Sequence, residues 1–141
     1  AVIGDFQLGP LSVAQVDEDF AAVKGSARVL RWHFGDDWPD GLTRDDNLID
    51  LAWHEREFTA RRSFAWIIRD ESGHYLGCAY LYPEPGSRGR GQVVTWMCDT
   101  PDRLERLETF NPAFQNWLLP FLPKDYVLRW TSNDDVKNEP A

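Results

Sequence analysis

Three strand-like segments follow one another in the middle of the chain and lead directly into a helix-start signal. They span residues 64–69, 75–82 and 92–98, and turn-forming residues separate them, as in consecutive antiparallel strands. Thr100-Pro101 then matches the start of a helix, because a proline loses no hydrogen bond at the first helical position. An antiparallel meander that feeds a helix predicts a mixed α+β fold with a mostly antiparallel central sheet and flanking helices.

The segments before the meander are predicted to be mainly helical. Residues 1–8 show no clear period and are interpreted as a frayed end, whereas residues 11–16 alternate like a strand. Apolar residues at helical spacing predict one or two short helices over residues 16–34, with an interruption at Gly25-Ser26.

A loop and a longer helix complete this half of the chain. Residues 34–41 are rich in turn formers, and Trp32 and Trp38 are expected to hold this loop against the domain because exposure of two indole rings is costly. Thr43 is a good N-cap for an amphipathic helix that runs to about Arg61, with acids early and basic residues late. The face predicted to be buried comprises Leu48, Leu51, Ala52, Glu55, Phe58 and Arg62.

The helix that starts at Pro101 is predicted to break at Asn111-Pro112, where the start signal repeats, and a second helix is predicted to end near Leu119. Residues 126–131 have the composition of a last strand, and residues 132–141 form a polar tail.

Alternation along the meander predicts which side chains share a face. On the first strand one side carries Phe64, Trp66 and Ile68, and on the second strand one side carries Cys78, Tyr80 and Tyr82. We therefore expect one face of the sheet to be aromatic on both strands.

The length of 141 residues fits a single domain over residues 1–141, with its core at about residues 11–131. The formal net charge of −8 argues against a nucleic-acid partner, which would require clustered Lys and Arg. No apolar run approaches the roughly 20 residues of a membrane span. Cys78 and Cys98 lack a metal-ligand spacing and are interpreted as reduced core residues. These features predict a cytoplasmic protein without metal or membrane partner.

The predicted order of elements is strand, helix, helix, three meander strands, helix and strand. It is similar to that of the Gcn5-related N-acetyltransferase (GNAT) family. The resemblance covers about residues 11–131 and implies a GNAT-like fold and the transfer of an acetyl group from acetyl-CoA to an amine. Short motifs also resemble a bacterial branch of GNAT-like proteins of unassigned substrate: His33-Phe34-Gly35, Trp38-Pro39, Gly41-Leu42-Thr43, Asp46-Asn47-Leu48, Glu57-Phe58, Arg62-Ser63-Phe64 and the segment 76–83.

The resemblance implies that the third meander strand offers backbone groups to the pantetheine arm of acetyl-CoA and that the next loop holds the pyrophosphate. In the family this loop is glycine-rich, so that free N–H groups and the helix dipole bind the anion. Here it contains no glycine, Pro101 removes one donor, and Asp99 and Asp102 add negative charge that Arg103 and Arg106 offset in part. We therefore expect an altered or lost phosphate grip. The predicted cofactor-binding residues are Trp96, Met97, Cys98, Thr100 and Arg103.

Catalysis in the GNAT family commonly uses a carboxylate or an ordered water to deprotonate the amine, and often a tyrosine to protonate the leaving thiolate. Such roles require hydrogen-bond reach and, for the carboxyl group, a raised pKa. The candidates by position are Glu57, Tyr80 and Tyr126. Half-buried packing with a satisfied hydroxyl is an equally good interpretation of the two tyrosines.

Three further features leave alternatives open. The glycine-rich basic loop at residues 86–91 is interpreted as a solvated hairpin connection, although a different strand register would make it a phosphate site. His33 is either a base or a partly buried histidine with a structural hydrogen bond. Cys78 and His54 could pair as in a hydrolase, but no activating turn surrounds either residue.

The sequence thus leaves two functions open. The first is an N-acetyltransferase for a small-molecule or protein amine, whose cationic form the acidic surface would attract. The second is a catalytically silent GNAT-fold module that binds a small molecule or a protein partner in an aromatic cleft. An aromatic sheet edge could also pair two chains as a homodimer. The predicted pocket residues are Trp32, His33, Trp38, Trp66 and Tyr82.

Overall fold

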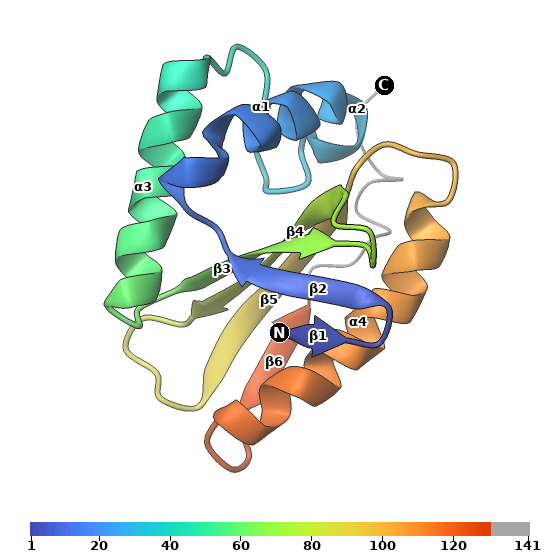
Figure 1. Ribbon diagram of the computed structural model, residues 1–141. Coiled ribbons are helices and arrows are strands. Elements are labelled where there is room, and N and C mark those ends of the chain that lie inside the picture. The colour runs from blue at the N-terminus through green and yellow to red at the C-terminus, as the bar shows by residue number, and fades with distance from the viewer. Residues whose placement is uncertain (131–141) are drawn as a thin grey trace.

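The computed structural model describes residues 1–130, in which six strands form one sheet in the order β1-β2-β3-β4-β5-β6 (Figure 1). The strands are β1 (Val2–Ile3), β2 (Phe6–Pro10), β3 (Phe64–Arg69), β4 (Tyr75–Pro83), β5 (Arg90–Met97) and β6 (Val127–Trp130). The helices are α1 (Val16–Gly25), α2 (Ala27–Leu30), α3 (Arg44–Thr59) and α4 (Arg103–Leu118), with short 3-10 turns η1 (Val13–Gln15) and η2 (Leu119–Phe121). Neighbouring strands pair antiparallel except β5 and β6, which are parallel.

The sheet separates two hydrophobic cores. On one face α4 packs against β1–β5 through Leu107, Phe110 and Phe114, all of which are buried. On the other face α1, α2 and α3 cover the sheet, and Leu30 and Leu51 are fully buried there (Figure 1). The mixed α+β class, the three-strand meander and the flanking helices are therefore as the sequence predicts. None of the helices within residues 1–130 has the length and apolar character needed to cross a membrane.

The start of the chain differs from the prediction. Residues 1–8 are not a frayed end, because β1 and β2 form a hairpin whose second strand, β2, pairs with β3, from Gln7 opposite Arg69 to Pro10 opposite Trp66. Residues 11–16 are not a strand either, because a capping box at Ser12 starts η1 and leads into α1. The pairing with β3 spans more than 50 residues of chain, so no local pattern could reveal it.

The helix α4 also corrects a prediction, because it runs without a break through Pro112. A proline in a helix interior costs about 3 kcal/mol. Phe110 and Phe114 flank it and are both fully buried, and their burial stabilises the continuous helix by a comparable amount of about 2 kcal/mol each. The helix begins at Arg103, with Asp102 as N-cap residue, rather than at Pro101.

The aromatic side chains of β3 and β4 do not share a face. Ala65 pairs with Tyr80 and Trp66 pairs with Ala79, so directly opposed residues put Tyr80 and Trp66 on opposite faces of the sheet. Trp66 belongs to the core under α4, whereas Tyr80 belongs to the core under α1–α3. Each face therefore has its own aromatic cluster.

The buried face of α3 is rotated from the predicted one. Thr43 is the N-cap, as expected, with a complete capping box. The residues of α3 that are buried are Asn47, Leu51, His54 and Glu57, whereas Ala52 and Glu55 of the predicted face are exposed. Polar side chains of α3 thus point inward, and His54 is the one of them that lines the pocket described next.

Candidate functional site

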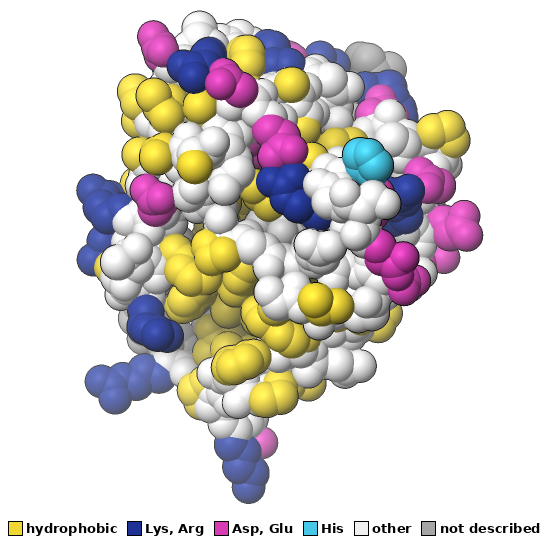
Figure 2. All heavy atoms as spheres, viewed as in Figure 1, with side chains coloured by type: hydrophobic (Ala, Val, Ile, Leu, Met, Phe, Trp, Pro, Cys, Tyr) yellow, Lys and Arg dark blue, Asp and Glu magenta, His cyan; other side chains and the backbone are white. Residues whose placement is uncertain are grey.

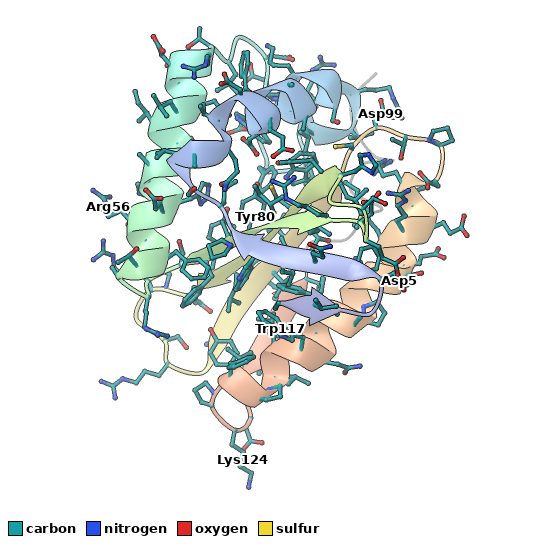
Figure 3. The ribbon with its side chains drawn as sticks, in the orientation of Figure 1. Asp5, Arg56, Tyr80, Asp99, Trp117 and Lys124 are labelled. Carbon is teal, nitrogen blue, oxygen red and sulfur yellow. The ribbon has the colours of Figure 1, made fainter. Side chains whose placement is uncertain are left out.

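A small pocket of about 180 Å³ lies between α3, β4 and the loop that joins α2 to α3. Its lining combines four aromatic rings with two carboxylates and one imidazole. The residues are Phe34, Asp36, Trp38, Asp50, His54, Tyr80 and Tyr82. Figure 3 shows the labelled Tyr80 on β4, beneath α1 and beside α3.

Asp50 and His54 form a pair on α3. They are four residues apart, which places both side chains on one side of the helix. Nε2 of His54 lies 3.5 Å from Oδ2 of Asp50. The His54 side chain is 8% exposed, whereas that of Asp50 is 47% exposed. The pair therefore brings a buried imidazole close to a carboxylate at the mouth of the pocket, and an imidazole is a group that can transfer protons near neutral pH.

Aromatic rings form the walls of the pocket. Tyr80 and Tyr82 stack with their ring centroids 5.7 Å apart. Phe34 makes edge contacts with both Tyr80 and Trp38. The backbone N–H of Trp38 donates to the Asp36 carboxylate, which fixes the turn of this loop. Aromatic faces next to two carboxylates favour a cation such as an ammonium group.

Three hollows meet at Tyr82. The pocket shares Phe34 and Tyr82 with a hollow of about 570 Å³ that Gln92 and Val94 of β5 also line. Tyr82 and Gln92 in turn line a third hollow, of about 500 Å³, that reaches β6. Tyr82 therefore stands between the pocket at α3 and the edge of β5.

His33 lies on the β5 edge. It is buried, and its Nε2 is 3.0 Å from the carbonyl oxygen of Thr95, to which it donates. The structural hydrogen bond proposed for His33 from the sequence is thus present. The described part of β6 pairs with residues 90–93 of β5. Thr95 lies beyond this pairing, and its carbonyl oxygen bonds to the His33 side chain instead.

A further hollow of about 480 Å³ lies at the N-terminus of α4 and is lined by Arg28, Asp99 and Arg103, among others. Arg28 donates two hydrogen bonds to Asp99, at 2.9 and 2.6 Å. Asp102 accepts a bond of 2.7 Å from Arg106. Figure 3 shows Asp99 close to α2 and to the start of α4. The two acids at this junction are therefore paired with arginines. Arg28 lowers the pKa of the Asp99 carboxyl group, and hydrogen bonds from Thr100 and then Arg106 lower the pKa of the Asp102 carboxyl group.

A buried polar network lies behind the pocket and joins α1, α3 and β4. Asp19 of α1 is 4% exposed and accepts hydrogen bonds from the Tyr75 hydroxyl and from the Asn47 amide. The Tyr75 hydroxyl is also 3.0 Å from Sγ of Cys78. Burial raises the pKa of the Cys78 thiol well above its usual range, so this cysteine is a poor nucleophile.

Asp19 gives a prediction on stability. Burial raises the pKa of its carboxyl group, against the opposing hydrogen bonds of Tyr75 and Asn47. Because the folded-state pKa exceeds the unfolded one, the folded state binds the proton more tightly and gains stability as the pH falls through the raised pKa. We therefore expect the wild type to become more stable relative to Asp19→Asn as the pH falls from neutral to mildly acidic. The difference between their unfolding free energies is measured by urea titration.

Titrations of both proteins at each pH cancel the contributions of all other groups, and a difference independent of pH would contradict the assignment. Asp19→Ala is expected to cost about 2 kcal/mol at neutral pH, because Tyr75 and Asn47 lose a buried partner.

No protein-family model matches the chain, and no curated protein matches it in sequence. Solved structures do match its fold. RimL, a ribosomal L7/L12 alpha-N-protein acetyltransferase solved with coenzyme A, gives a TM-score of 0.69 at 12% identity over 84% of this chain and 66% of that chain. The microcin C7 self-immunity acetyltransferase MccE, solved with acetyl-CoA and AMP, gives 0.60 at 8% identity over 81% and 63%.

A GNAT-family acetyltransferase from Bordetella pertussis gives a TM-score of 0.61 at 16% identity over 86% of this chain and 70% of that chain. This chain has the GNAT fold. It spans 64% and 66% of the length of two of the RimL structures that it matches. The resemblance inferred from the sequence is thus confirmed at the level of the fold.

The three predicted catalytic residues are far from equivalent in this GNAT fold. Glu57 is bonded to Arg62 at 2.6 Å, and this pairing lowers the pKa of its carboxyl group, the reverse of what a general base requires. Tyr80 lines the pocket, is buried and accepts a hydrogen bond from the Trp96 indole. Tyr126 lies just before β6 and beside Gly91, at the end of β5 that is remote from the N-terminus of α4.

The predicted pocket residues lie in three different places. Trp38 and Tyr82 line the pocket, and Trp32 and His33 line the neighbouring hollow. Trp66 lies on the opposite face of the sheet, for the reason given by the strand register.

The predicted cofactor residues follow the end of β5 into α4 of the GNAT fold. Trp96 and Met97 are buried on opposite faces, and Cys98 is half-buried. Thr100 and Arg103 line the hollow at the start of α4.

Sequence reasoning missed the pair of Asp50 and His54 and the role of Arg28. The first had a signal, because an acid and a histidine four residues apart on a helix lie side by side. The second had none, because Arg28 and Asp99 are 71 residues apart in the chain. Within residues 1–130, no group of three or more His, Cys, Asp or Glu side chains is arranged to hold a metal ion.

Proposed function

We propose that this protein is an N-acetyltransferase that moves an acetyl group from acetyl-CoA to a primary amine. The observation that carries the proposal is the pocket at α3, in which Asp36, Asp50 and His54 lie among aromatic rings and from which only Phe34 and Tyr82 separate the hollow at the β5 edge. The GNAT fold and its CoA-bound structural neighbours support the same reaction class.

The residues at the α4 N-terminus fit the anionic part of acetyl-CoA. Arg28, Arg103 and Arg106 bring three positive charges to the start of a 16-residue helix, whose dipole also favours an anion. The Arg28 side chain is 72% exposed in its pair with Asp99. Exposed pairs are worth about 0 to 1 kcal/mol, so a phosphate can replace Asp99 as the partner of Arg28.

The chain's own residues then divide the work. Asp36 and Asp50 attract the ammonium form of the acceptor, and Phe34, Tyr80 and Tyr82 exclude water from it. His54, which lies beside Asp50, accepts the proton that the amine must lose before it attacks. Acetyl-CoA, when bound, supplies the activated thioester whose acetyl group the neutral amine receives.

Two measurements test this proposal together. Isothermal titration calorimetry with acetyl-CoA should show saturable binding, and a thiol-reactive dye should show CoA release when primary amines are added. Release without any amine gives the hydrolysis background. Absence of heat at millimolar acetyl-CoA would refute the proposal.

The acids at the α4 N-terminus favour the second candidate, a binding module without catalysis. Asp99 and Asp102 stabilise the empty helix end by roughly 0.3 to 1 kcal/mol each. The aromatic pocket would then bind a cation without transfer, and amines would perturb tryptophan fluorescence without any release of CoA.

Asp99→Asn is expected to tighten acetyl-CoA binding about fivefold, because it removes a negative charge and releases Arg28 from its strongest partner. Calorimetry on both proteins measures the change. Asp45→Asn is the matched control, since Asp45 lies in the first turn of another helix of equal length. Unchanged or weaker binding to Asp99→Asn would show that the phosphates lie elsewhere.

A further inference from the structure

A hydrophobic hollow lies on the α4 face of the sheet, opposite the face that holds the pocket. Figure 2 shows hydrophobic side chains gathered in it, between the C-terminal ends of α3 and α4. Phe58, Phe64 and Trp117 are only partly buried at the edge of the core there. Trp117 contacts Trp66 at 5.7 Å and Phe121 at 5.3 Å between ring centroids. Phe121 is 72% exposed.

A group of aromatic rings in contact with one another, one of them strongly exposed, is unusual on a protein surface that binds no partner. Phe58 contacts Phe64 at 5.3 Å and Trp66 at 5.6 Å, so the rings of α3, β3 and α4 form one continuous cluster. The cluster is concave and half-buried, which suits insertion of a side chain from a partner.

Basic side chains lie along two margins of this hollow, although the whole chain is acidic. Figure 2 shows Lys and Arg side chains along the left and lower margins of the same face, and Figure 3 places Arg56 and Lys124 at these margins. Two of the arginines, Arg56 and Arg62, pair with the carboxylate of Glu57. The end of α3, the β4–β5 loop beside it and the segment between η2 and β6 supply this basic rim (Figure 1), whose exposed residues are Arg56, Arg61, Arg62, Arg88 and Lys124. The positive charge is therefore local, against a net charge of −8.

We propose that this hollow binds an acidic peptide segment of a partner protein, which inserts a bulky apolar side chain among Phe58, Phe64, Trp117 and Phe121. The carboxylates of such a segment would lie against the basic rim, which sets orientation and association rate. A second copy of this chain fits poorly, because a two-fold contact at this face would place one basic rim against another. A bilayer also fits poorly, because most of the rings are recessed rather than protruding.

The test uses a synthetic peptide with an acetylated N-terminus and no lysine, so that it cannot serve as an acceptor amine. It carries Glu and Asp around a central Phe-Leu pair, and binding is followed by tryptophan fluorescence at low and at physiological salt. Saturable binding that weakens with salt is expected. The same peptide with Lys in place of its acids should not bind. The outcome is independent of acetyl transfer, because the hollow and the pocket lie on opposite faces.

Variants identify the surface. Phe121→Ser and the double variant Arg61→Glu/Arg88→Glu should each weaken binding about tenfold. Ile49→Ser and Arg44→Glu are matched controls, because both residues are exposed on other parts of α3. Equal binding of acidic and basic peptides would overturn the proposal. So would self-association lost in Phe121→Ser, or binding to anionic vesicles but not to the peptide.

Discussion

Replacing His54 by glutamine is expected to lower kcat for acetyl transfer by about a hundredfold or more, because a positioned general base contributes roughly 10²- to 10⁴-fold. Glutamine keeps a polar side chain of similar length in the pocket but cannot take up a proton near neutral pH. The measurement is the rate of CoA release at saturating amine. KM for acetyl-CoA should change little, since the hollow at the α4 N-terminus does not include His54.

Two further variants separate proton transfer from structural damage. His74→Gln is the matched control, because the His74 side chain is 77% exposed and lies in a turn. Asp50→Asn should keep the fold but lower kcat, because a neutral partner stabilises the imidazolium formed by proton transfer less well. A His54→Gln enzyme with wild-type kcat and pH profile would remove His54 from the mechanism.

Gly77→Ala is expected to destabilise the fold by about 3 kcal/mol, because the added methyl group would meet backbone rather than a flexible side chain. A Cβ atom at Gly77 would lie 2.0 Å from the carbonyl oxygen of Trp96 and 2.7 Å from Cα of Met97. To remove this clash, β4 and β5 would have to separate at the pairing of Gly77 with Met97, where β5 leads toward α4. Chemical denaturation measures the loss.

Gly9→Ala is the matched control for Gly77→Ala. Gly9 is also a strand glycine, with no atom within 4 Å of an added Cβ and no positive φ. Alanine there should be neutral or stabilise the protein by up to about 1 kcal/mol. Similar stabilities of the two alanine variants would contradict the close approach of β4 and β5.

Much of the fold could be predicted because the relevant signals are local. The three meander strands lie where alternation and turn residues indicate, and the N-cap of α3 at Thr43 is correct. The break predicted at Pro112 was wrong, because the cost of one proline was weighed without the burial of Phe110 and Phe114 beside it. Local propensity fails where packing contributes more free energy than the propensity itself.

The candidate site could be predicted only in part. Trp38, Tyr80 and Tyr82 do line the pocket, since large rings are recognisable by type. Glu57 was chosen as a base because of its position, but its pairing with Arg62 depends on the turn that follows α3. Burial, charge pairing and the face on which a side chain lies all require the third dimension.

The sequence by itself determined the class of fold, because hydrophobic period, turn residues and caps act over a few residues. It also indicated the two acids, Asp99 and Asp102, that precede α4. Only the tertiary structure decided that Asp99 is neutralised by Arg28, that Trp66 and Tyr80 face opposite ways, and that Asp50 and His54 face an aromatic pocket. These outcomes depend on strand register and on contacts between distant residues, whose free energies no local pattern encodes.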